Sequence, residues 1–368
     1  MKRSLRRIIT HSFHDVLMKT QRVNLSLLVL ACLISPTITI TELAKSFLCL
    51  PDSPHKKLNE NTKYKHKEKR LSRFLKNERI IVSKLFPTVL SLALKNLSRK
   101  NEIFVIIDQT DLPLGYQAIF AALAYKGRAL PFAFTLFKYE NIAMSQNIIE
   151  YEFFELVVNL LKAKNIRPVF IMDRGYCDVK IVKKLRELDT RFIIRAVSNV
   201  WIEARDNNFK GLIGQFTQVG AFEDCIYHKK EQVLLNIAVG RNEQGDYIWV
   251  ISDLNPSRVI ELYKLRMQIE ETFRDIKSLL GLKTLKLRED EFTQMKLEKI
   301  LLALMCGIII SAFLEGESRK YSGVLVRKNE DYSFVRIVKE VVSRLWETFI
   351  VEPRNLKFGS MLYYNLLP

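Results

Sequence analysis

Two aspartates in this sequence, Asp108 and Asp173, each follow directly after a short run of apolar residues. The runs 103–107 and 168–172 have the length and composition of buried strands. Ligand sites in open α/β sheets gather at the carboxyl ends of the strands. Both aspartates are therefore candidate metal ligands or catalytic groups.

Either aspartate alone is weak evidence, because aspartates in loops also cap helices. Asp111 and Asp178 lie close to the first pair in the sequence. We expect these two to act as caps or as supporting partners. Asp111 also remains a rival of Asp108 for the role of ligand.

A third carboxylate, Glu270, stands in a predicted long helix that Asn255 caps and Pro256 begins. Four polar residues share about 60° of this helix, at about 100° per residue, namely Tyr263, Arg266, Glu270 and Lys277. The adjoining stripe is apolar and consists of Leu262, Leu265, Ile269, Phe273, Ile276 and Leu280. On an arbitrary helix the polar stripe would be a solvated face. A carboxylate flanked by two cations and a phenol instead suits a metal ligand among phosphate-binding groups.

This combination of residues fits the cleavage and transfer of phosphodiesters. Two metal ions roughly 3.5–4 Å apart can activate the nucleophile and stabilise the leaving oxygen. Three carboxylates hold such hard cations, so we expect Asp108, Asp173 and Glu270 to be catalytic metal ligands. Arg266 and Lys277 would bind phosphates of DNA, and Tyr263 would hydrogen-bond a phosphate beside them.

The order of the predicted elements indicates an α/β fold with a ribonuclease-H-like catalytic core. Besides the two strands above, the expected elements are strands at 118–124, 129–137 and 192–196, and helices at 146–164 and 179–188. Short strands and turns over 201–250 form a β-rich insertion before the helix of Glu270. The expected domains are a helical basic DNA-binding region (1–100), the core (101–200 and 251–319), the insertion (201–250) and a C-terminal helical segment (320–368).

The chain resembles the DDE transposases of the bacterial insertion-sequence-four family. Tyr263-x2-Arg266-x3-Glu270-x6-Lys277 matches the Tyr-Arg-Glu-Lys signature of that family. The segments 107–110 and 169–176, with Ile194-Arg195 downstream, look like the surroundings of its two aspartates. The resemblance covers residues 101 to about 312. Met267 departs from the pattern, since many relatives have Trp after the signature arginine.

The resemblance implies a transposase that cuts transposon ends and joins them to target DNA, by a cut-and-paste route through a hairpin intermediate. It implies two Mg²⁺ ions, for which Mn²⁺ substitutes. It also implies terminal inverted repeats and target DNA as partners, and a homodimer in a synaptic complex. The expected location is the bacterial cytoplasm, at the nucleoid and not in a membrane. The alternatives are a catalytically silent, transposase-derived DNA-binding protein and another ribonuclease-H-like nuclease.

The positive charge of the chain is concentrated at its beginning. Residues 1–100 hold 21 Lys and Arg against 6 Asp and Glu, while the whole chain has a net charge of +18. Such asymmetry indicates a nucleic-acid-binding arm beside a nearly neutral body. The tract 56–79 is densely basic, and Thr39 with Glu42 predicts a capped helix within a conceivable helix-turn-helix. These residues are expected to supply most of the DNA affinity.

Other features of the sequence exclude competing classes. The five cysteines are scattered without a CxxC pair, so neither a zinc ribbon nor a disulfide framework is expected. The apolar run 25–34 lacks the flanks of a signal peptide, and the run 300–314 is short for a membrane span and suits a buried core helix. A helix at 334–350 with an apolar stripe (Val335, Val338, Val341, Val342, Leu345, Phe349) is a candidate dimer contact, or plain core.

Overall fold

The computed structural model of the chain describes residues 2–48, 60–97, 102–141, 146–325 and 332–351. It contains two compact units. One consists of Met1–Asn96 together with Phe273–Pro368, and the other is Leu97–Thr272. The second unit carries the three candidate carboxylates.

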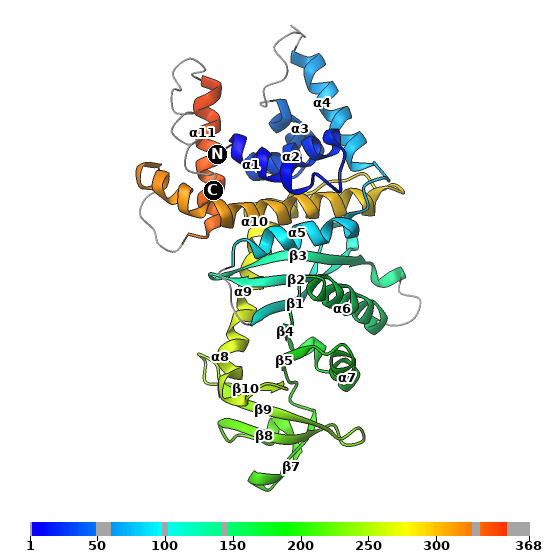
Figure 1. The fold of residues 1–368 in the computed structure, drawn as a ribbon, viewed down its shortest axis with the longest axis vertical. Helices are drawn as coiled ribbons and strands as arrows, with labels where there is room; N and C mark the ends of the chain where they lie inside the picture. The colour runs from blue at the N-terminus through cyan, green and yellow to red at the C-terminus, as the bar shows by residue number, and fades with distance from the viewer. Residues whose placement is uncertain (1, 49–59, 98–101, 142–145, 326–331, 352–368) are drawn as a thin grey trace. The chain divides into compact units, whose positions relative to one another are not determined.

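The second unit is built on a ten-stranded sheet in the order β3-β2-β1-β4-β5-β10-β9-β8-β6-β7 (Figure 1). Its strands are β1 (Ile103–Asp111), β2 (Gln117–Tyr125), β3 (Arg128–Phe137), β4 (Pro168–Met172), β5 (Arg191–Arg195), β6 (Trp201–Ala204), β7 (Phe209–Leu212), β8 (Gly220–Tyr227), β9 (Val233–Arg241) and β10 (Tyr247–Ser252). β1, β4 and β5 are parallel, and the remaining pairings are antiparallel. This mixed α/β architecture is consistent with the ribonuclease-H-like transposase fold that the sequence predicts.

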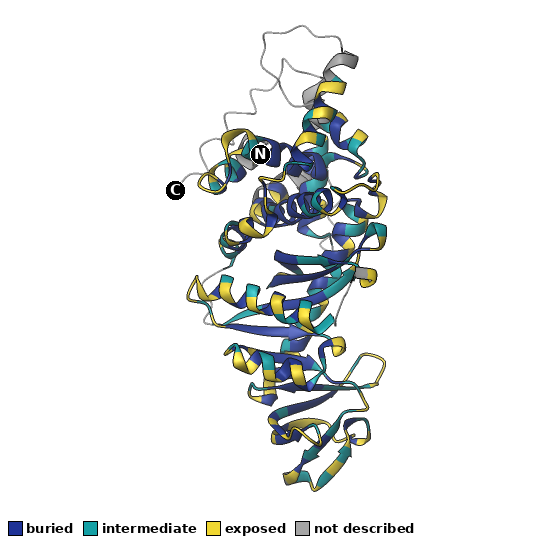
Figure 2. Cartoon of the chain, turned by 90° about the vertical axis from the view of Figure 1, so that its right-hand side faces the viewer, coloured by how far each residue is buried: buried dark blue, intermediate teal, exposed yellow. Residues whose placement is uncertain are grey.

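The apolar runs become the central strands because their side chains are buried on both faces of the sheet. All five residues of β4 are buried (Figure 2). The hairpin of β2 and β3 turns at Lys126 and Gly127, whose φ angles of 36° and 73° are both positive. A two-residue turn with two positive φ angles matches the right-handed twist of the strands that it joins.

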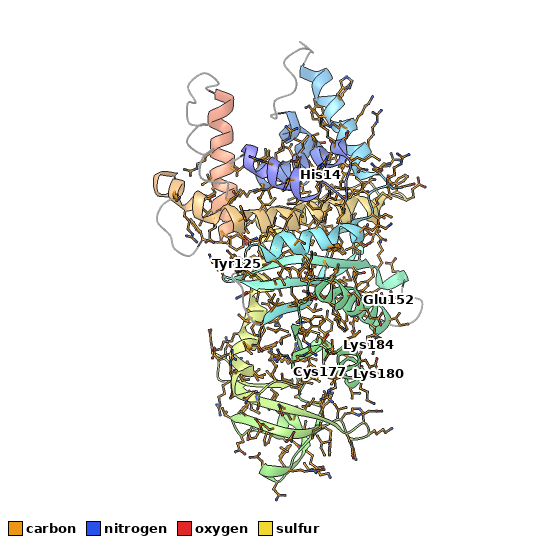
Figure 3. The ribbon with its side chains drawn as sticks, in the orientation of Figure 1. His14, Tyr125, Glu152, Cys177, Lys180 and Lys184 are labelled. Atoms are coloured by element: carbon orange, nitrogen blue, oxygen red, sulfur yellow. The ribbon has the colours of Figure 1, made fainter. Side chains whose placement is uncertain are left out.

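Helix α6 (Gln146–Lys162) follows the edge strand β3, and helix α7 (Val179–Glu187) follows the central strand β4. Asp178 caps α7, since its Oδ1 accepts from the amide of Lys180 at 2.8 Å. Lys184 of α7, labelled in Figure 3, pairs with Glu155 of α6 at 2.5 Å. The expected cap role of Asp178 is therefore confirmed.

The first unit is helical. Its helices are α1 (Lys2–Ser12), α2 (Lys19–Ile34), α3 (Ile40–Leu48), α4 (Glu60–Leu75), η1 (Val82–Leu85), α5 (Phe86–Leu94), η10 (Leu282–Thr284), α10 (Thr293–Leu325) and α11 (Phe334–Val351). Thr39 caps α3 as expected, because its hydroxyl accepts from the amide of Glu42 at 3.1 Å. Residues 56–59 of the basic tract lie outside the described part of the chain.

The core of the first unit lies around α10, which packs against α2 and α11. The stretch Thr293–Gly316 is long and apolar enough to cross a membrane, but 89% of its most apolar part is buried inside the protein. The expectation of a buried core helix over 300–314 is confirmed. In α11, Val335, Val338, Val341 and Val342 are buried as well, so these four residues belong to the core; the side chains of Leu345 and Phe349 lie outside the described residues.

Candidate active site

The two aspartates follow neighbouring parallel strands at the same level. Ile107 of β1 pairs with Met172 of β4, and Asp108 and Asp173 are the next residues of the two strands. The carboxyl ends of parallel strands meet at one edge of a sheet, so the register places both carboxylates there. Asp111, the rival candidate, lies three residues further on and is exposed.

The turn after β4 fixes the Asp173 carboxylate. Its Oδ1 accepts from the amide of Gly175 at 2.8 Å and caps the 3₁₀ helix η4 (Arg174–Tyr176). A Cβ atom on Gly175 would lie 3.0 Å from the same oxygen. Glycine at this position therefore lets the backbone approach the carboxylate closely.

Asp108 is buried, with only 8% of its surface exposed. Burial raises the pKa of its carboxyl to about 6, and the charges of Asp173 and Glu270 raise it too. The Arg266 guanidinium and the amide of Gln109, which donates at 2.9 Å, act in the opposite direction. The carboxylate form of Asp108 thus depends on nearby positive charge.

The helical run that carries Glu270 differs from the single regular helix that we expected. Asn255 caps its start, since Oδ1 accepts from the amide of Ser257 at 3.0 Å. The run then consists of η7 (Pro256–Arg258), α8 (Val259–Tyr263), the 3₁₀ helix η8 (Lys264–Arg266), α9 (Met267–Arg274) and the π-helical η9 (Asp275–Leu279). The expected cap is confirmed, but the run is tightened at η8 and widened at η9. The spacing of 3.6 residues per turn therefore does not hold as far as Lys277.

Arg266 connects two of the three carboxylates. Its Nη1 donates to Asp108 Oδ2 at 3.2 Å, and its Nη2 donates to Glu270 Oε1. The side chain of Arg266 is 13% exposed, so these ion pairs are screened less than pairs at the surface. The structure therefore brings Asp108, Arg266 and Glu270 together, with Asp173 on the strand next to Asp108.

The other two residues of the signature, Tyr263 and Lys277, lie in different compact units. Tyr263 is buried at the end of α8, and its hydroxyl has a pKa raised by burial and lowered by the charges of Arg266 and Arg195. Tyr263 therefore lies within the electrostatic reach of the same site. Lys277 is half-buried in η9, which belongs to the other compact unit, and its expected role stays a prediction.

The contacts that hold α9 in place join residues far apart in the sequence and could not be predicted from it. The amide of Tyr125, a residue labelled in Figure 3, donates to Gln268 Oε1 at 2.8 Å. The amide of Ala129 donates to the hydroxyl of Thr272 at 2.8 Å. Gln268 and Thr272 are one turn apart on α9, so both ends of the β2–β3 hairpin turn are bonded to the helix that carries Glu270. Polar residues at this spacing have the pattern of a solvated helix face, so nothing in the sequence indicates that they are bonded to the sheet.

A buried acid that we had not singled out, Glu150 of α6, lies near the aspartates. Gln146 Nε2 donates to Glu150 Oε1 at 2.8 Å and to Gln109 Oε1 at 2.9 Å, and Gln109 directly follows Asp108. Burial raises the pKa of Glu150, and the charge of Asp173 adds to this effect. The sequence did hold a signal, because Glu150 shares a helical stripe with buried apolar residues, namely Phe153, Phe154, Val157 and Leu161.

The carboxylates of Asp108, Asp173 and Glu270 suit hard divalent cations, which prefer oxygen ligands. Among the described residues, no group of three or more acidic, histidine or cysteine side chains is gathered closely enough to hold a metal ion as it stands. The guanidinium of Arg266 instead bonds both Asp108 and Glu270 and supplies positive charge there. The hydroxyl of Tyr176 is buried and has no hydrogen-bond partner in the described part of the chain. Burial raises its pKa, and the charges of Asp108 and Asp173 raise it further.

Comparison with known proteins gives one family. Residues 100–306, more than half of the chain, match the family described as transposase DDE domain. No curated protein is significantly similar to the chain.

Two solved structures of endonuclease V from Ciona intestinalis, each bound to DNA containing an inosine followed by a ribo-adenosine, share 17% and 16% sequence identity with it. The first covers 55% of this chain and 98% of its own, and the second, of a single-residue variant, covers 54% and 96%. Both TM-scores are 0.32.

Proposed function

This chain belongs to the family of proteins with a transposase DDE domain, and on that premise we propose that it is a DNA transposase of the insertion-sequence-four type. Asp108, Asp173 and Glu270 would be its catalytic metal ligands. The observation that carries the proposal is the buried Asp108. It lies in β1, which is parallel to the strand β4 that Asp173 follows, and Arg266 bonds both Asp108 and Glu270.

In this proposal the carboxylates hold metal ions, and the remaining residues of the signature bind phosphates. Two Mg²⁺ ions, or Mn²⁺ in their place, would be held by Asp108, Asp173 and Glu270, and when bound would activate the nucleophile and stabilise the leaving oxygen. Arg266 has the fork geometry that binds a phosphate through two parallel hydrogen bonds, once its guanidinium leaves the carboxylates. Tyr263 and Lys277, the other members of the signature, would hold neighbouring phosphates of the DNA end.

The substrate of the proposed reaction is duplex DNA. Terminal inverted repeats would be cut and joined to target DNA through a hairpin intermediate, within a synaptic complex of two copies of the chain. A protein that acts on bacterial chromosomal DNA works in the cytoplasm, at the nucleoid. The family and its signature support these assignments.

Two aspartates of β1 offer a matched test of the proposal. Asp108→Asn removes a buried candidate ligand, whereas Asp111→Asn removes the same charge from an exposed position three residues away. On DNA that ends in the inverted repeat, with Mg²⁺ or Mn²⁺, we expect Asp108→Asn to lower the cleavage rate about a hundred- to a thousandfold, the scale of electrostatic stabilisation in active sites. Asp111→Asn should cleave like the wild type.

The same assay separates the alternatives. Cleavage of any duplex without joining would indicate another nuclease with this core. Binding of the repeat without metal-dependent cleavage by the wild type would indicate a silent DNA-binding relative. Equal loss in both variants would remove Asp108 from its assigned role.

A further inference from the structure

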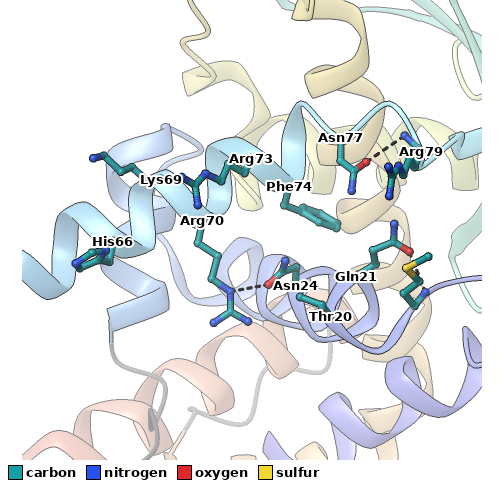
Figure 4. A pocket seen from close by; sticks show the side chains of 11 residues that line it. Thr20, Gln21, Asn24, His66, Lys69, Arg70, Arg73, Phe74, Asn77 and Arg79 are labelled. Atoms are coloured by element: carbon teal, nitrogen blue, oxygen red, sulfur yellow. Dashed lines mark hydrogen bonds between the residues drawn. The ribbon is translucent and has the colours of Figure 1, made fainter. Parts of the chain in front are cut away.

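The first unit contains an open cavity of about 800 Å³ between α2 and α4 (Figure 4). One wall is formed by the first turns of α2, with Thr20, Gln21 and Asn24. The other wall is formed by α4 and the residues after it. We call this cavity the α2–α4 groove. It belongs to the unit that does not carry the candidate carboxylates.

The α4 wall of the groove is a cationic stripe at helical spacing. His66, Lys69, Arg70 and Arg73 lie at offsets 0, 3, 4 and 7 along α4, so they share one face of the helix. Arg79 adds a further positive charge beyond the end of α4. None of the described side chains that line the groove is acidic. The charge of this wall is therefore not neutralised from within the groove.

One of these cations is held in place. Arg70 Nε donates to Asn24 Oδ1 across the groove at 2.7 Å, as Figure 4 shows. Asn24 is itself buried, with 8% of its surface exposed. A guanidinium has five N–H groups, so this bond fixes Arg70 and leaves four further N–H groups for an anion. The groove thus combines one arginine held by a hydrogen bond with exposed cations at Lys69, Arg73 and Arg79.

We propose that the α2–α4 groove binds the sugar-phosphate backbone of duplex DNA, as a second contact apart from the carboxylate site. This rests on the proposed function, because it takes DNA as the substrate. The stripe from His66 to Arg73 advances seven residues along α4, which is about 10 Å. Phosphates of one strand advance about 3.4 Å each along the duplex, so the stripe spans about three of them.

The chemistry of the groove favours backbone contacts that are independent of sequence. Lysine and arginine beside amide side chains are the groups that bind phosphate oxygens, and such contacts position a protein without reading bases. A membrane surface would be met instead by an outward-facing patch of cations with apolar residues between them. The groove is concave, and its cations face amides.

The test uses the full-length protein and two triple variants that remove the same charge from the same unit. The groove variant is Lys69→Gln, Arg73→Gln and Arg79→Gln. The control is Lys65→Gln, Lys84→Gln and Lys95→Gln, whose lysines are exposed and do not line the groove. Binding to a fluorescein-labelled duplex is measured by anisotropy at several salt concentrations without metal, once for a random sequence and once for the inverted repeat.

We expect the groove variant to reduce the slope of log affinity against log salt by about 2 to 3, since each lost phosphate contact contributes about 0.9. The control should change the slope by less than about 1. Both duplexes should be affected equally, and the thermal unfolding midpoints of the two variants should agree. Equal slopes for groove variant and control would overturn the proposal, as would a loss confined to the inverted repeat.

Three further outcomes show how this inference stands beside the proposed function. If the wild type binds and cleaves DNA while the groove variant keeps the wild-type slope, the groove has no such role and the transposase assignment stands. If the wild type binds no duplex at all, both are overturned. Binding of ATP that is lost in the groove variant, with the DNA slope unchanged, would make the groove a nucleotide site instead.

Discussion

Arg266 holds two of the three candidate metal ligands, and this makes it a competitor of any cation that binds between them. An opposite charge within about 4–6 Å favours the ionised carboxylate, and a metal ion would provide the same benefit. The guanidinium and the metal therefore stabilise the same negative charges. The guanidinium must therefore leave the carboxylate oxygens of Asp108 and Glu270 when a metal ion binds to them.

We therefore expect Arg266→Ala to bind Mn²⁺ and Mg²⁺ several times more tightly than the wild type in the absence of DNA, as a coupling of about 1 kcal/mol implies. Isothermal titration with Mn²⁺ measures this directly. Lys264→Ala is the matched control, because Lys264 lies in the same 3₁₀ helix but is exposed and pairs with Glu261. Weaker metal binding in Arg266→Ala would show that the arginine shapes the ligand set and does not compete with the metal.

At the scale of elements, the position of Glu270 depends on how α9 is attached to the sheet. Thr272 is buried on α9, and its hydroxyl accepts from the Ala129 amide at 2.8 Å and lies 3.0 Å from the Ala129 carbonyl oxygen. Valine has the same shape but leaves a buried amide without a partner, which costs about 1–3 kcal/mol. We expect Thr272→Val to lose that much stability in urea unfolding and to lower the cleavage rate, because the helix of Glu270 is less firmly placed.

Serine at the same position distinguishes the hydrogen bond from the packing of the methyl group. Thr272→Ser keeps the hydroxyl and should recover most of the cleavage rate. If serine and valine impair cleavage equally, the methyl group and not the hydrogen bond positions α9.

A second attachment between elements involves a buried lysine. Lys299 of α10 is fully buried, and its Nζ donates to the carbonyl oxygen of Leu75 at 2.9 Å, at the C-terminal end of α4. Burial lowers the pKa of Lys299 from 10.5 to about 8, which the nearby glutamates only partly oppose. Between these values the unfolded chain binds a proton that the folded chain has lost, so stability must rise with pH in this window.

Comparing the wild type with Lys299→Met isolates this effect. From pH 8 to 10.5, we expect the free energy of unfolding of the wild type to rise by up to about 3 kcal/mol relative to the variant, from about 1.4 kcal/mol per pKa unit. Urea unfolding followed by circular dichroism at pH 7, 8, 9 and 10.5 measures it. Lys95→Met, which removes an exposed lysine, should run parallel to the wild type. A constant difference between wild type and Lys299→Met would contradict the lowered pKa.

The elements that could be predicted from the sequence are those with a local signal. β4 was predicted with its bounds, because an apolar run ends at a charged residue, and the cap at Asn255 follows from Pro256. The breaks of the Glu270 helix at η8 and η9 could not be predicted, since 3₁₀ and π turns leave no pattern in residue types. Gln268 could not be predicted for another reason: its partner Tyr125 is distant in the sequence, and nothing local distinguishes a buried amide from a solvated one.

At the scale of the whole molecule, the first unit is assembled from both ends of the chain. Lys339 Nζ donates to the carbonyl oxygen of Ser35 at 2.9 Å, and the amide of the Asn96 side chain reaches the carbonyl oxygen of Ile309 at 3.5 Å. The sequence predicted that 300–314 is a core helix, but it did not show what covers that helix. Periodicity identifies an apolar face, whereas its partner is decided by long-range packing.

This arrangement changes how the DNA affinity of the basic first hundred residues has to be tested. Deleting residues 1–96 would remove α2 and α5, which pack on α10, and would expose a large apolar surface. Exposed patches of more than a few hundred Å² promote association. We therefore expect the fragment 97–368 to aggregate. The fragment 97–272 keeps its own sheet and all three carboxylates, so we expect it to remain soluble and to unfold cooperatively.

Size-exclusion chromatography with light scattering, together with thermal unfolding, distinguishes the two fragments. A monomeric 97–368 fragment that unfolds cooperatively would show that the N-terminal helices are dispensable for the fold, and deletion would then be a fair test of their DNA affinity. If the fragment aggregates, its lost DNA binding says nothing about charge, because the folded unit has been lost as well. Charge substitutions in the intact chain are then the informative route, since exposed lysines and arginines can be changed without uncovering α10.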